Sequence, residues 1–256
     1  PPIFPVLSSG FCDFFQIFAK QTRLHARQSG LFLILMRLRT SGAFVDHTDW
    51  RNHIMRKQIQ LQVNEMVEDV LSNHFRNPCG HAYSVRNVTL RMLKTTSVAH
   101  LEKFMFNPRE ALQIANAAYL HDIGKLMIPK KILNKNGPLT QKEREVMESH
   151  TMDGAMLIFF HPNYHQRVLQ KYAFEIALHH HERVDGSGYP DGLSGLSLYP
   201  WVQIVSLADV FVALTEERSY RAAYTQEEAW KMIQQGECGA FDERLLRCLE
   251  QSQENG

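Results

Sequence analysis

Apolar residues recur at helical spacing along most of the chain from Ile54 onwards. Side chains at intervals of about three, four and seven residues lie on one face of an α-helix. The first such stripe ends before Pro78 and contains Val63, Met66, Val67, Val70, Leu71 and Phe75. A second helix is predicted from His81 to about His100, with its inner side formed by Val85, Val88, Met92 and Leu93.

A third helix is predicted to begin at Pro108 and to end at the pair His121–Asp122. Three positions at three-residue steps form its expected buried stripe: Leu112, Ala115 and Ala118. This helix should carry the histidine and the aspartate inward at its C-terminal end, where Gly124 can stop it. A buried ionised carboxylate is costly unless it is paired or bound to a metal, so Asp122 needs a partner.

The rest of the chain alternates helical patterns with irregular segments. Residues 128–138 are predicted to form a loop, and Thr140 to cap a helix that carries Val146, Met147 and His150 and runs to Phe160. Residues 182–192 contain too much glycine and proline for a regular element. Further helices are expected from about Gln166 to His179–His181, from Pro200 to Leu214, and over residues 226–233 and 243–249. No strand is expected outside the N-terminal region, so the predicted fold class is all-α.

Residues 1–53 lack a clear periodicity and are assigned to a small N-terminal accessory region, ahead of a main domain over residues 54–256. The accessory region fits either the remnant of a sensor domain or an extension that packs on the main domain. Because the chain begins with Pro1 rather than Met, we expect a fragment or a processed form, for which an upstream membrane or sensor region stays open.

Composition adds one hint. The chain is 44% hydrophobic and 21% charged, which is ordinary for a soluble globular protein, and its net charge of +1 gives no reason to expect a DNA or RNA polymer or an anionic membrane as partner. The best apolar run, residues 31–38, is too short to span a bilayer. The four cysteines are scattered, as is typical of reduced thiols in a cytosolic protein. The thirteen histidines point to metal.

Seven residues on or beside predicted helices could bind metal: His81, His121, Asp122, His150, His180, His181 and Asp209. A single histidine on a helix is more often an ordinary core or surface residue than a ligand, but the combination of seven such residues favours a metal site. Imidazoles mixed with carboxylates and without thiolates favour iron or manganese over structural zinc. More ligands are present than one tetrahedral ion needs, so we predict two divalent ions, with Asp122 bridging them.

The run His121-Asp122-Ile123-Gly124-Lys125 resembles the HD superfamily of metal-dependent phosphohydrolases. The segment from His180 to Pro190, HHERVDGSGYP, resembles the signature HHExxDGxGYP of the HD-GYP subfamily. Shorter matches support the assignment: Ile128–Pro129, Ile132–Leu133, Gly137, Leu139–Thr140, Glu143, His150, Ala208–Asp209, Ala213–Thr215, Arg218, Tyr220 and Arg221. The resemblance covers roughly His81 to Leu249.

The resemblance implies an HD-domain helical bundle with a buried binuclear metal centre, in the bacterial cytoplasm. It implies hydrolysis of cyclic di-GMP, by a metal-activated hydroxide, to pGpG, and leaves open whether the product is cleaved again to GMP. The family's ligands carry over to the seven residues above, with His179 left as a neighbour of the pair His180–His181. Asp122 and Lys125 become the catalytic residues. Contacts to the substrate are expected from Lys125, Arg183, Asp185, Gly188, Tyr189, Arg218 and Arg221.

Two departures from the family pattern refine this expectation. Some members hold a third metal through a glutamate one turn before the first histidine ligand, but this chain has Asn77 there, followed by Pro78, so we predict two metals. Val212 replaces a frequent aspartate, a change that we interpret as structural.

Alternative functions stay open. They are hydrolysis of another cyclic dinucleotide such as cyclic GMP-AMP, and a slow or inactive receptor for cyclic di-GMP. An all-α scaffold with incidental histidines would leave Asp122 and Asp209 uncompensated. A protein partner at the glycine-rich loop and a homodimer are further predicted partners.

Overall fold

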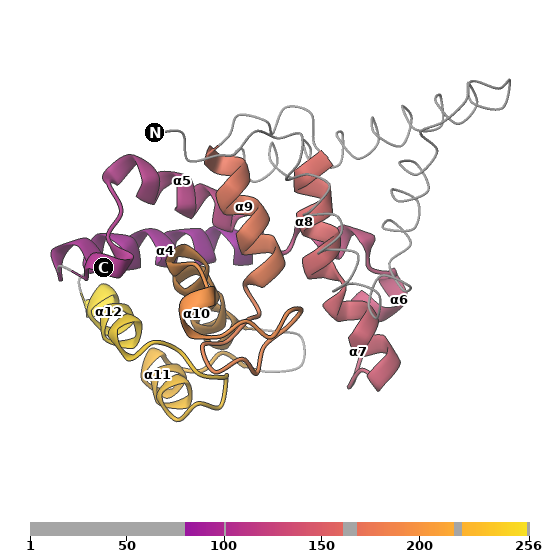
Figure 1. Ribbon diagram of the computed structural model, residues 1–256. Helices are drawn as coiled ribbons and strands as arrows, with labels where there is room; N and C mark the ends of the chain where they lie inside the picture. Colours follow the sequence, from indigo (N-terminus) through magenta and orange to yellow (C-terminus); the bar gives the residue numbers. More distant parts are fainter. Residues whose placement is uncertain (1–79, 100, 161–167, 218–221, 255–256) are drawn as a thin grey trace, which may run out of the picture. The chain divides into compact units, whose positions relative to one another are not determined.

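The computed structural model describes residues 80–99, 101–160, 168–217 and 222–254. Within them the fold is all-α, as predicted, and the single β-type pairing is an isolated bridge between Asp185 and Ser194. The elements in Figure 1 are α4 (His81–Val98), η1 (Glu102–Phe104), α5 (Pro108–Ala118), η2 (Ile123–Met127), α6 (Lys130–Leu133), α7 (Gln141–Glu148), α8 (His150–Phe160), α9 (Val168–His179), η4 (Gly195–Ser197), α10 (Pro200–Thr215), α11 (Gln226–Gln234) and α12 (Glu243–Glu254). None of the helices in these ranges is long and apolar enough to cross a membrane.

Helix α10 forms the centre of the bundle. It packs against α4, α9, α11 and α12, and every residue from Trp201 to Asp209 is buried. A helix that is apolar nearly all round belongs in a core, so the one carboxylate in this run, Asp209, is conspicuous. On the facing side, α4 buries the predicted residues Val85, Val88, Met92 and Leu93.

Capping residues define several helix starts. Asn107 and Glu110 form a reciprocal capping box at α5, and Pro108 takes the first helical position as predicted. Thr140, the predicted N-cap, forms the same kind of box with Glu143 at α7. These side chains satisfy backbone N–H groups that have no partner inside the helix.

The predicted stripe on α5 was wrong at one position. Leu112 is 46% exposed, whereas Ala115 and Ala118 are buried together with Ala111 and Ile114. Residues three apart on an α-helix are offset by about 60° around the helix axis. Leu112 and Ala118, which are two such steps apart, therefore differ by about 120° and lie on different faces.

The predicted role of Gly124 was also wrong. Helix α5 already ends at Ala118, and Gly124 lies in the following η2 turn. A Cβ atom at this glycine would lie 1.8 Å from the carbonyl oxygen of His150. Gly124 therefore allows η2 to approach α8 closely, which brings His121 and Asp122 near His150.

Two other element predictions need correction. The segment predicted as a loop over residues 128–138 contains the short helix α6. The single helix predicted from Thr140 to Phe160 divides at Ser149 into α7 and α8, so that His150 begins α8. The predicted helix before Pro78, the accessory region over residues 1–53 and the domain boundary at residue 54 lie outside the described residues.

Candidate metal centre

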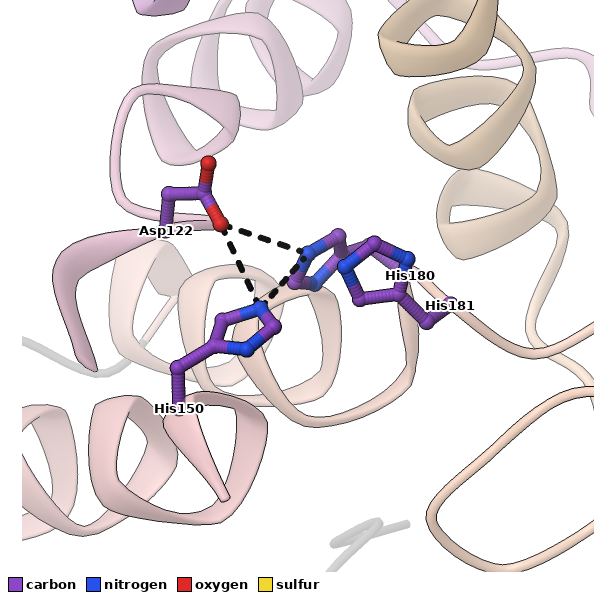
Figure 2. A group of neighbouring side chains, drawn as sticks. All are labelled: Asp122, His150, His180 and His181. Atoms are coloured by element: carbon purple, nitrogen blue, oxygen red, sulfur yellow. Dashed lines mark hydrogen bonds and ion pairs between the residues drawn. The ribbon is translucent and has the colours of Figure 1, made fainter. Parts of the chain in front are cut away.

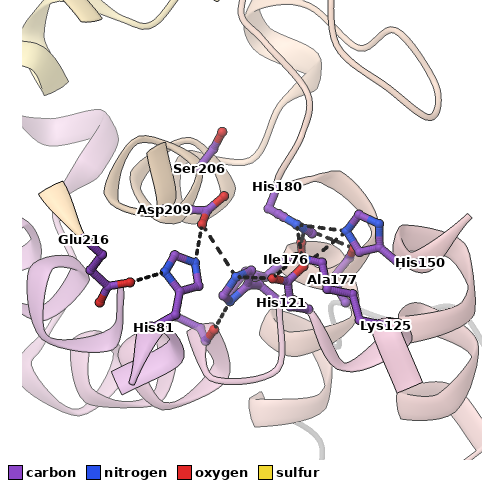
Figure 3. Close-up of polar contacts among 12 residues, drawn as sticks. His81, His121, Lys125, His150, Ile176, Ala177, His180, Ser206, Asp209 and Glu216 are labelled. Carbon is purple, nitrogen blue, oxygen red and sulfur yellow. Dashed lines mark hydrogen bonds and ion pairs between the residues drawn. The ribbon is translucent and has the colours of Figure 1, made fainter. Parts of the chain in front are cut away.

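The structure brings together all seven predicted ligands, although they come from five separate places in the chain. His81 begins α4, His121 and Asp122 lie in the turn between α5 and η2, and His150 begins α8. The pair His180–His181 directly follows α9, and Asp209 comes from the buried face of α10. Helix ends and one core helix therefore meet at this point (Figures 2 and 3).

One group of side chains consists of Asp122, His150, His180 and His181 (Figure 2). The Oδ1 atom of Asp122 lies 3.3 Å from Nε2 of His150 and 3.7 Å from Nε2 of His180. The two Nε2 atoms lie 3.4 Å apart. One potential ligand atom from each of the four side chains lies within 4.8 Å of the others, which is compact enough for a single ion.

A second group surrounds the other oxygen of Asp122. Its Oδ2 atom lies 3.2 Å from Nε2 of His121, which is also 3.6 Å from Oδ1 of Asp209. The same Asp209 oxygen lies 2.9 Å from Nε2 of His81. Asp122 thus directs one carboxylate oxygen to each group, the arrangement that a bridging ligand requires.

Hydrogen bonds fix which nitrogen of three buried histidines faces the centre. The Nδ1 atoms of His121, His150 and His180 donate to the carbonyl oxygens of Ala118 (2.8 Å), Met147 (2.7 Å) and Ile176 (3.0 Å). In the neutral ring the Nε2 atom then carries a lone pair, the form in which histidine binds metal. The three Nε2 atoms point towards Asp122 and towards one another.

This arrangement fits a bound cation. Lone pairs of imidazole and carboxylate oxygens repel one another at these distances unless positive charge lies between them. Nε2 of His121 and Oδ1 of Asp122 are buried and make no hydrogen bond. Buried polar atoms nearly always form hydrogen bonds. Two buried atoms without one, both in the same cluster of ligand atoms, therefore support a bound ion at this position.

Electrostatics keeps His180, His181 and Asp122 in the protonation state that binds metal. Burial lowers the pKa of His180 to about 4 and that of His181 well below its ordinary value. Burial opposes ionisation of Asp122, but His121 outweighs it and holds the pKa of this carboxyl well below its ordinary value. Burial also lowers the pKa of His121, yet Asp122 overcomes this and raises it to about 9, so in the metal-free chain a proton supplies the compensating charge.

Lys125 lies at the accessible side of this centre. Its Nζ atom donates to Oδ2 of Asp122 at 2.5 Å, and its side chain is 39% exposed. The ammonium is therefore both anchored to the bridging carboxylate and open to a ligand from solvent.

A family profile described as "HD domain" matches residues 65–245. The chain belongs to the HD domain family. The recognition of its HD-GYP branch from sequence motifs is also confirmed.

The relatives match different fractions of the chain. It is 34% identical, over 245 residues, to the cyclic di-GMP phosphodiesterase response regulator RpfG of Xanthomonas campestris, covering 95% of this chain and 62% of the relative. It is 39% identical over 140 residues to 3'3'-cGAMP-specific phosphodiesterase 2 of Vibrio cholerae, covering 55% of this chain and 26% of that protein. The chain therefore spans less than two thirds of these relatives' length.

A solved structure supports the fold. Bd1817, described as an HDG"Y"P protein from Bdellovibrio bacteriovorus, superposes with a TM-score of 0.52 at 18% sequence identity. The match covers 68% of this chain and 51% of the other. At this identity the likeness shows the shared HD fold alone.

The irregular segment over residues 182–192, which we call the HD-GYP loop, folds back onto His180 and His181. A Cβ atom at Gly188 would lie 2.4 Å from Cα of Glu182 and from the carbonyl oxygen of His181, so only glycine permits this approach. The ring of Tyr189 stacks on that of His181, with centroids 4.7 Å apart and planes 21° apart. Gly188 and Tyr189 thus shape the wall of the centre beside His181.

Four side chains, Glu175, His179, Glu182 and Asp191, tie this loop to α9, and we call them the loop latch. Glu182 accepts hydrogen bonds from the backbone N–H groups of Asp191 (2.7 Å) and Leu193 (3.0 Å). His179 lies between Glu175 (3.1 Å) and Asp191 (3.0 Å). Burial works against the charge on His179, but these two carboxylates raise its pKa to about 9. His179 therefore serves the latch, whereas His180 and His181 belong to the cluster that could hold a metal ion, as the sequence register predicts.

Arg183 and Asp185, two predicted substrate contacts in the HD-GYP loop, already form hydrogen bonds within the protein. Arg183 donates to the carbonyl oxygens of Cys238 (2.9 Å) and Glu182 (2.8 Å) and to Oγ of Ser206 (2.8 Å). Oδ1 of Asp185 accepts from the N–H group (3.0 Å) and the hydroxyl group (2.7 Å) of Ser187. Arg218, Arg221 and Asn77 lie outside the described residues.

Sequence reasoning missed one residue beside the centre. Oε2 of Glu216 lies 2.9 Å from Nδ1 of His81 (Figure 3). A signal was present, since Glu216 follows Asp209 by seven residues and positions seven apart share a helix face.

Proposed function

We propose that this HD-GYP domain hydrolyses cyclic di-GMP to pGpG, with two divalent ions held by the seven clustered residues; further cleavage to GMP stays open. The observation that carries the proposal is the shared carboxylate. Asp122 joins two compact ligand groups, and its Oδ1 atom is buried without a hydrogen bond. The relatives described as cyclic di-GMP phosphodiesterases support the choice of substrate.

The ligand set supports the choice of metal. The two groups offer imidazole nitrogens and carboxylate oxygens and no thiolate, a combination that suits iron or manganese. When bound, two such ions would lower the pKa of a water and place positive charge opposite the phosphate oxygens.

The chain's own residues position the reaction. Asp122 is held in place by Lys125 at one oxygen and faces His150 at the other, so its orientation is set before substrate arrives. Lys125, which is partly exposed, donates to a non-bridging phosphate oxygen and offsets the charge that builds there. The water oxygen forms the new bond to phosphorus and releases a proton to solvent. The bond to the ribose 3'-oxygen breaks, and that oxygen takes up a proton from solvent. The linear product carries a 5'-phosphate and a free 3'-hydroxyl.

The HD-GYP loop supplies a wall to the substrate site. Tyr189 stacks one ring face on His181, so its opposite face and its edge are the parts that can contact a guanine. Gly188 lets the loop approach His181 closely enough to place Tyr189 for that contact. Arg183 and Asp185 act on substrate through the loop that they hold, and Arg218 and Arg221 stay predicted phosphate contacts.

A second substrate has specific support. Three relatives from Vibrio cholerae are described as 3'3'-cGAMP-specific phosphodiesterases, and one of them is 39% identical over 140 residues. Hydrolysis of 3'3'-cGAMP would use the same metal centre and differ in the base contacts. A slow cyclic di-GMP receptor, a protein partner at the loop, a homodimer and a location in the bacterial cytoplasm stay predictions.

The test is metal content and turnover of anaerobically purified chain. We expect about two iron or manganese ions per chain and conversion of cyclic di-GMP to pGpG that stops after chelation and returns with Mn²⁺. Matched reactions with 3'3'-cGAMP rank the two substrates. Two bound ions with binding but no hydrolysis would support the receptor, and a folded chain that binds no metal would contradict the proposal.

A further inference from the structure

His81 differs from the other buried histidines of the centre in how its ring is held. His121, His150 and His180 each donate Nδ1 to a carbonyl oxygen three or four residues earlier in the chain. His81 is the first residue of α4, so no earlier turn of its own helix offers such a carbonyl. Its Nδ1 atom instead meets the carboxylate of Glu216, at 2.9 Å.

We propose that Glu216 is a positioning residue for the metal ion that His81 helps to bind. A carboxylate can only accept, so the Glu216 contact places the ring proton on Nδ1. Nε2 then faces Oδ1 of Asp209, 2.9 Å away, where an ion shared by the two side chains can lie (Figure 3). This inference rests on the proposed binuclear centre.

The location of Glu216 makes this contact firm. It caps the C-terminal end of α10, two turns beyond Asp209, so one helix carries both the ligand and the group that orients its neighbour. Glu216 also lies beside the N-terminal end of α4, which has no acidic residue in its own first turn and no side-chain cap. The positive end of the helix dipole therefore favours a carboxylate at this position.

The Glu216 contact also fixes the orientation of the His81 ring, with Nε2 aimed at Oδ1 of Asp209. His81 needs this help because its side chain is 27% exposed, against 1% or less for His121, His150 and His180. The more exposed ring loses more freedom on binding an ion, and Glu216 removes part of that freedom beforehand.

The test is Mn²⁺ binding to the metal-depleted full chain. Glu216→Ala and Glu216→Leu both remove the acceptor, and leucine keeps most of the side-chain volume should alanine impair folding. We expect one of the two Mn²⁺ ions to bind about 10- to 100-fold more weakly, with the other unchanged. Electron paramagnetic resonance should change from a spin-coupled pair to an isolated ion, as in His81→Ala. Glu216→Gln retains an acceptor oxygen and should recover most of the affinity.

Glu217→Gln is the matched control, because Glu217 is the adjacent residue and is exposed. It should bind both ions as the unchanged chain does. Wild-type binding of both ions by folded Glu216→Leu would overturn the inference and leave the binuclear centre intact. Absence of a second ion in the unchanged chain would instead overturn the proposed function.

Discussion

The metal centre and the loop latch are adjacent polar clusters with opposite states of bonding. Both are built around the C-terminal end of α9, where His179 and Glu182 belong to the latch and His180 and His181 to the centre. Both carboxylate oxygens of Glu182 accept backbone N–H groups, whereas Oδ1 of Asp122 makes no hydrogen bond. A saturated cluster holds its loop without help, and an unsaturated one gains most of its stability from a ligand.

The same sequence signal therefore produced two kinds of site. A histidine or carboxylate in an apolar segment indicates burial, and burial demands compensation. In the latch the compensation comes from the chain itself. In the candidate metal centre the chain offers imidazole nitrogens and two carboxylates from several helices, and only Oδ2 of Asp122 is paired with Lys125, so a bound cation would complete the compensation.

The largest effect is expected from Asp122→Asn. The amide loses the charge that both ligand groups share, and its NH₂ group cannot bind metal. Turnover should fall by about 10²- to 10³-fold or more, as when a central electrostatic group is lost. Urea unfolding under chelation should show only a modest loss of stability, because Oδ2 loses its ion pairs with Lys125 and His121 while Oδ1 makes no hydrogen bond in the metal-free chain. If Asp122→Asn instead fails to fold without metal, the contrast between the two clusters is wrong.

Glu182→Gln is expected to have a smaller effect, and to lower the stability of the fold rather than the turnover. The amide replaces one of two acceptor oxygens and points a donor at a backbone N–H group of Asp191 or Leu193. Losing a charge-assisted bond in the interior should lower the free energy of unfolding by about 2 to 3 kcal/mol, with or without metal. Hydrogen exchange at the amides of Asp191 and Leu193 should accelerate.

The control is Asp185→Asn, a carboxylate-to-amide change in the same loop. Asp185 is exposed, and one oxygen accepts both bonds from Ser187, so asparagine can keep them. Its unfolding should match that of the unchanged chain. Equal stability of Glu182→Gln and the unchanged chain would show that the latch does not hold the loop.

Local chemistry explains which parts of the fold were predictable. The inner face of α4 and the starts at Pro108, Thr140 and Pro200 follow from periodicity and capping, which depend on neighbouring residues only. The HD and HD-GYP motifs identified all seven clustered side chains because the family pattern already encodes which distant helices meet.

What sequence missed depends on contacts between distant elements. Gly124 is needed because the carbonyl of His150 lies where its Cβ atom would be. Leu112 is exposed because α5 packs on the core through the face that carries Ala111 and Ile114. Glu216 shares a helix face with Asp209, but its role depends on α10 ending beside the start of α4. Local spacing can mark such a position, and only three-dimensional packing shows which residue it meets.

The smallest expected effect concerns a saturated cluster at the surface, formed by Lys135, Thr140 and Glu143. The hydrogen bond from Lys135, with those of Thr140, lowers the pKa of Glu143 to about 2 from its ordinary 4.5. A lowered carboxyl pKa means that this stabilisation is present above pH 4.5 and is lost as the pH falls through about 2. Glu143→Gln keeps the capping oxygen and loses the charge. The stability gap between the two chains should therefore be constant above about pH 5 and close towards pH 2.

Urea unfolding at a series of pH values measures this gap, with Glu228→Gln as the reference. Glu228 closes the same kind of capping box at α11, but no described lysine forms an ion pair with it. Its gap should be smaller than that of Glu143, because the lysine contact is the difference between the two boxes. A gap for Glu143 that persists unchanged at pH 2 would mean that the carboxylate stabilises the chain by packing rather than by charge. Bonded polar clusters would then owe their effect to shape, at the surface as well as in the latch.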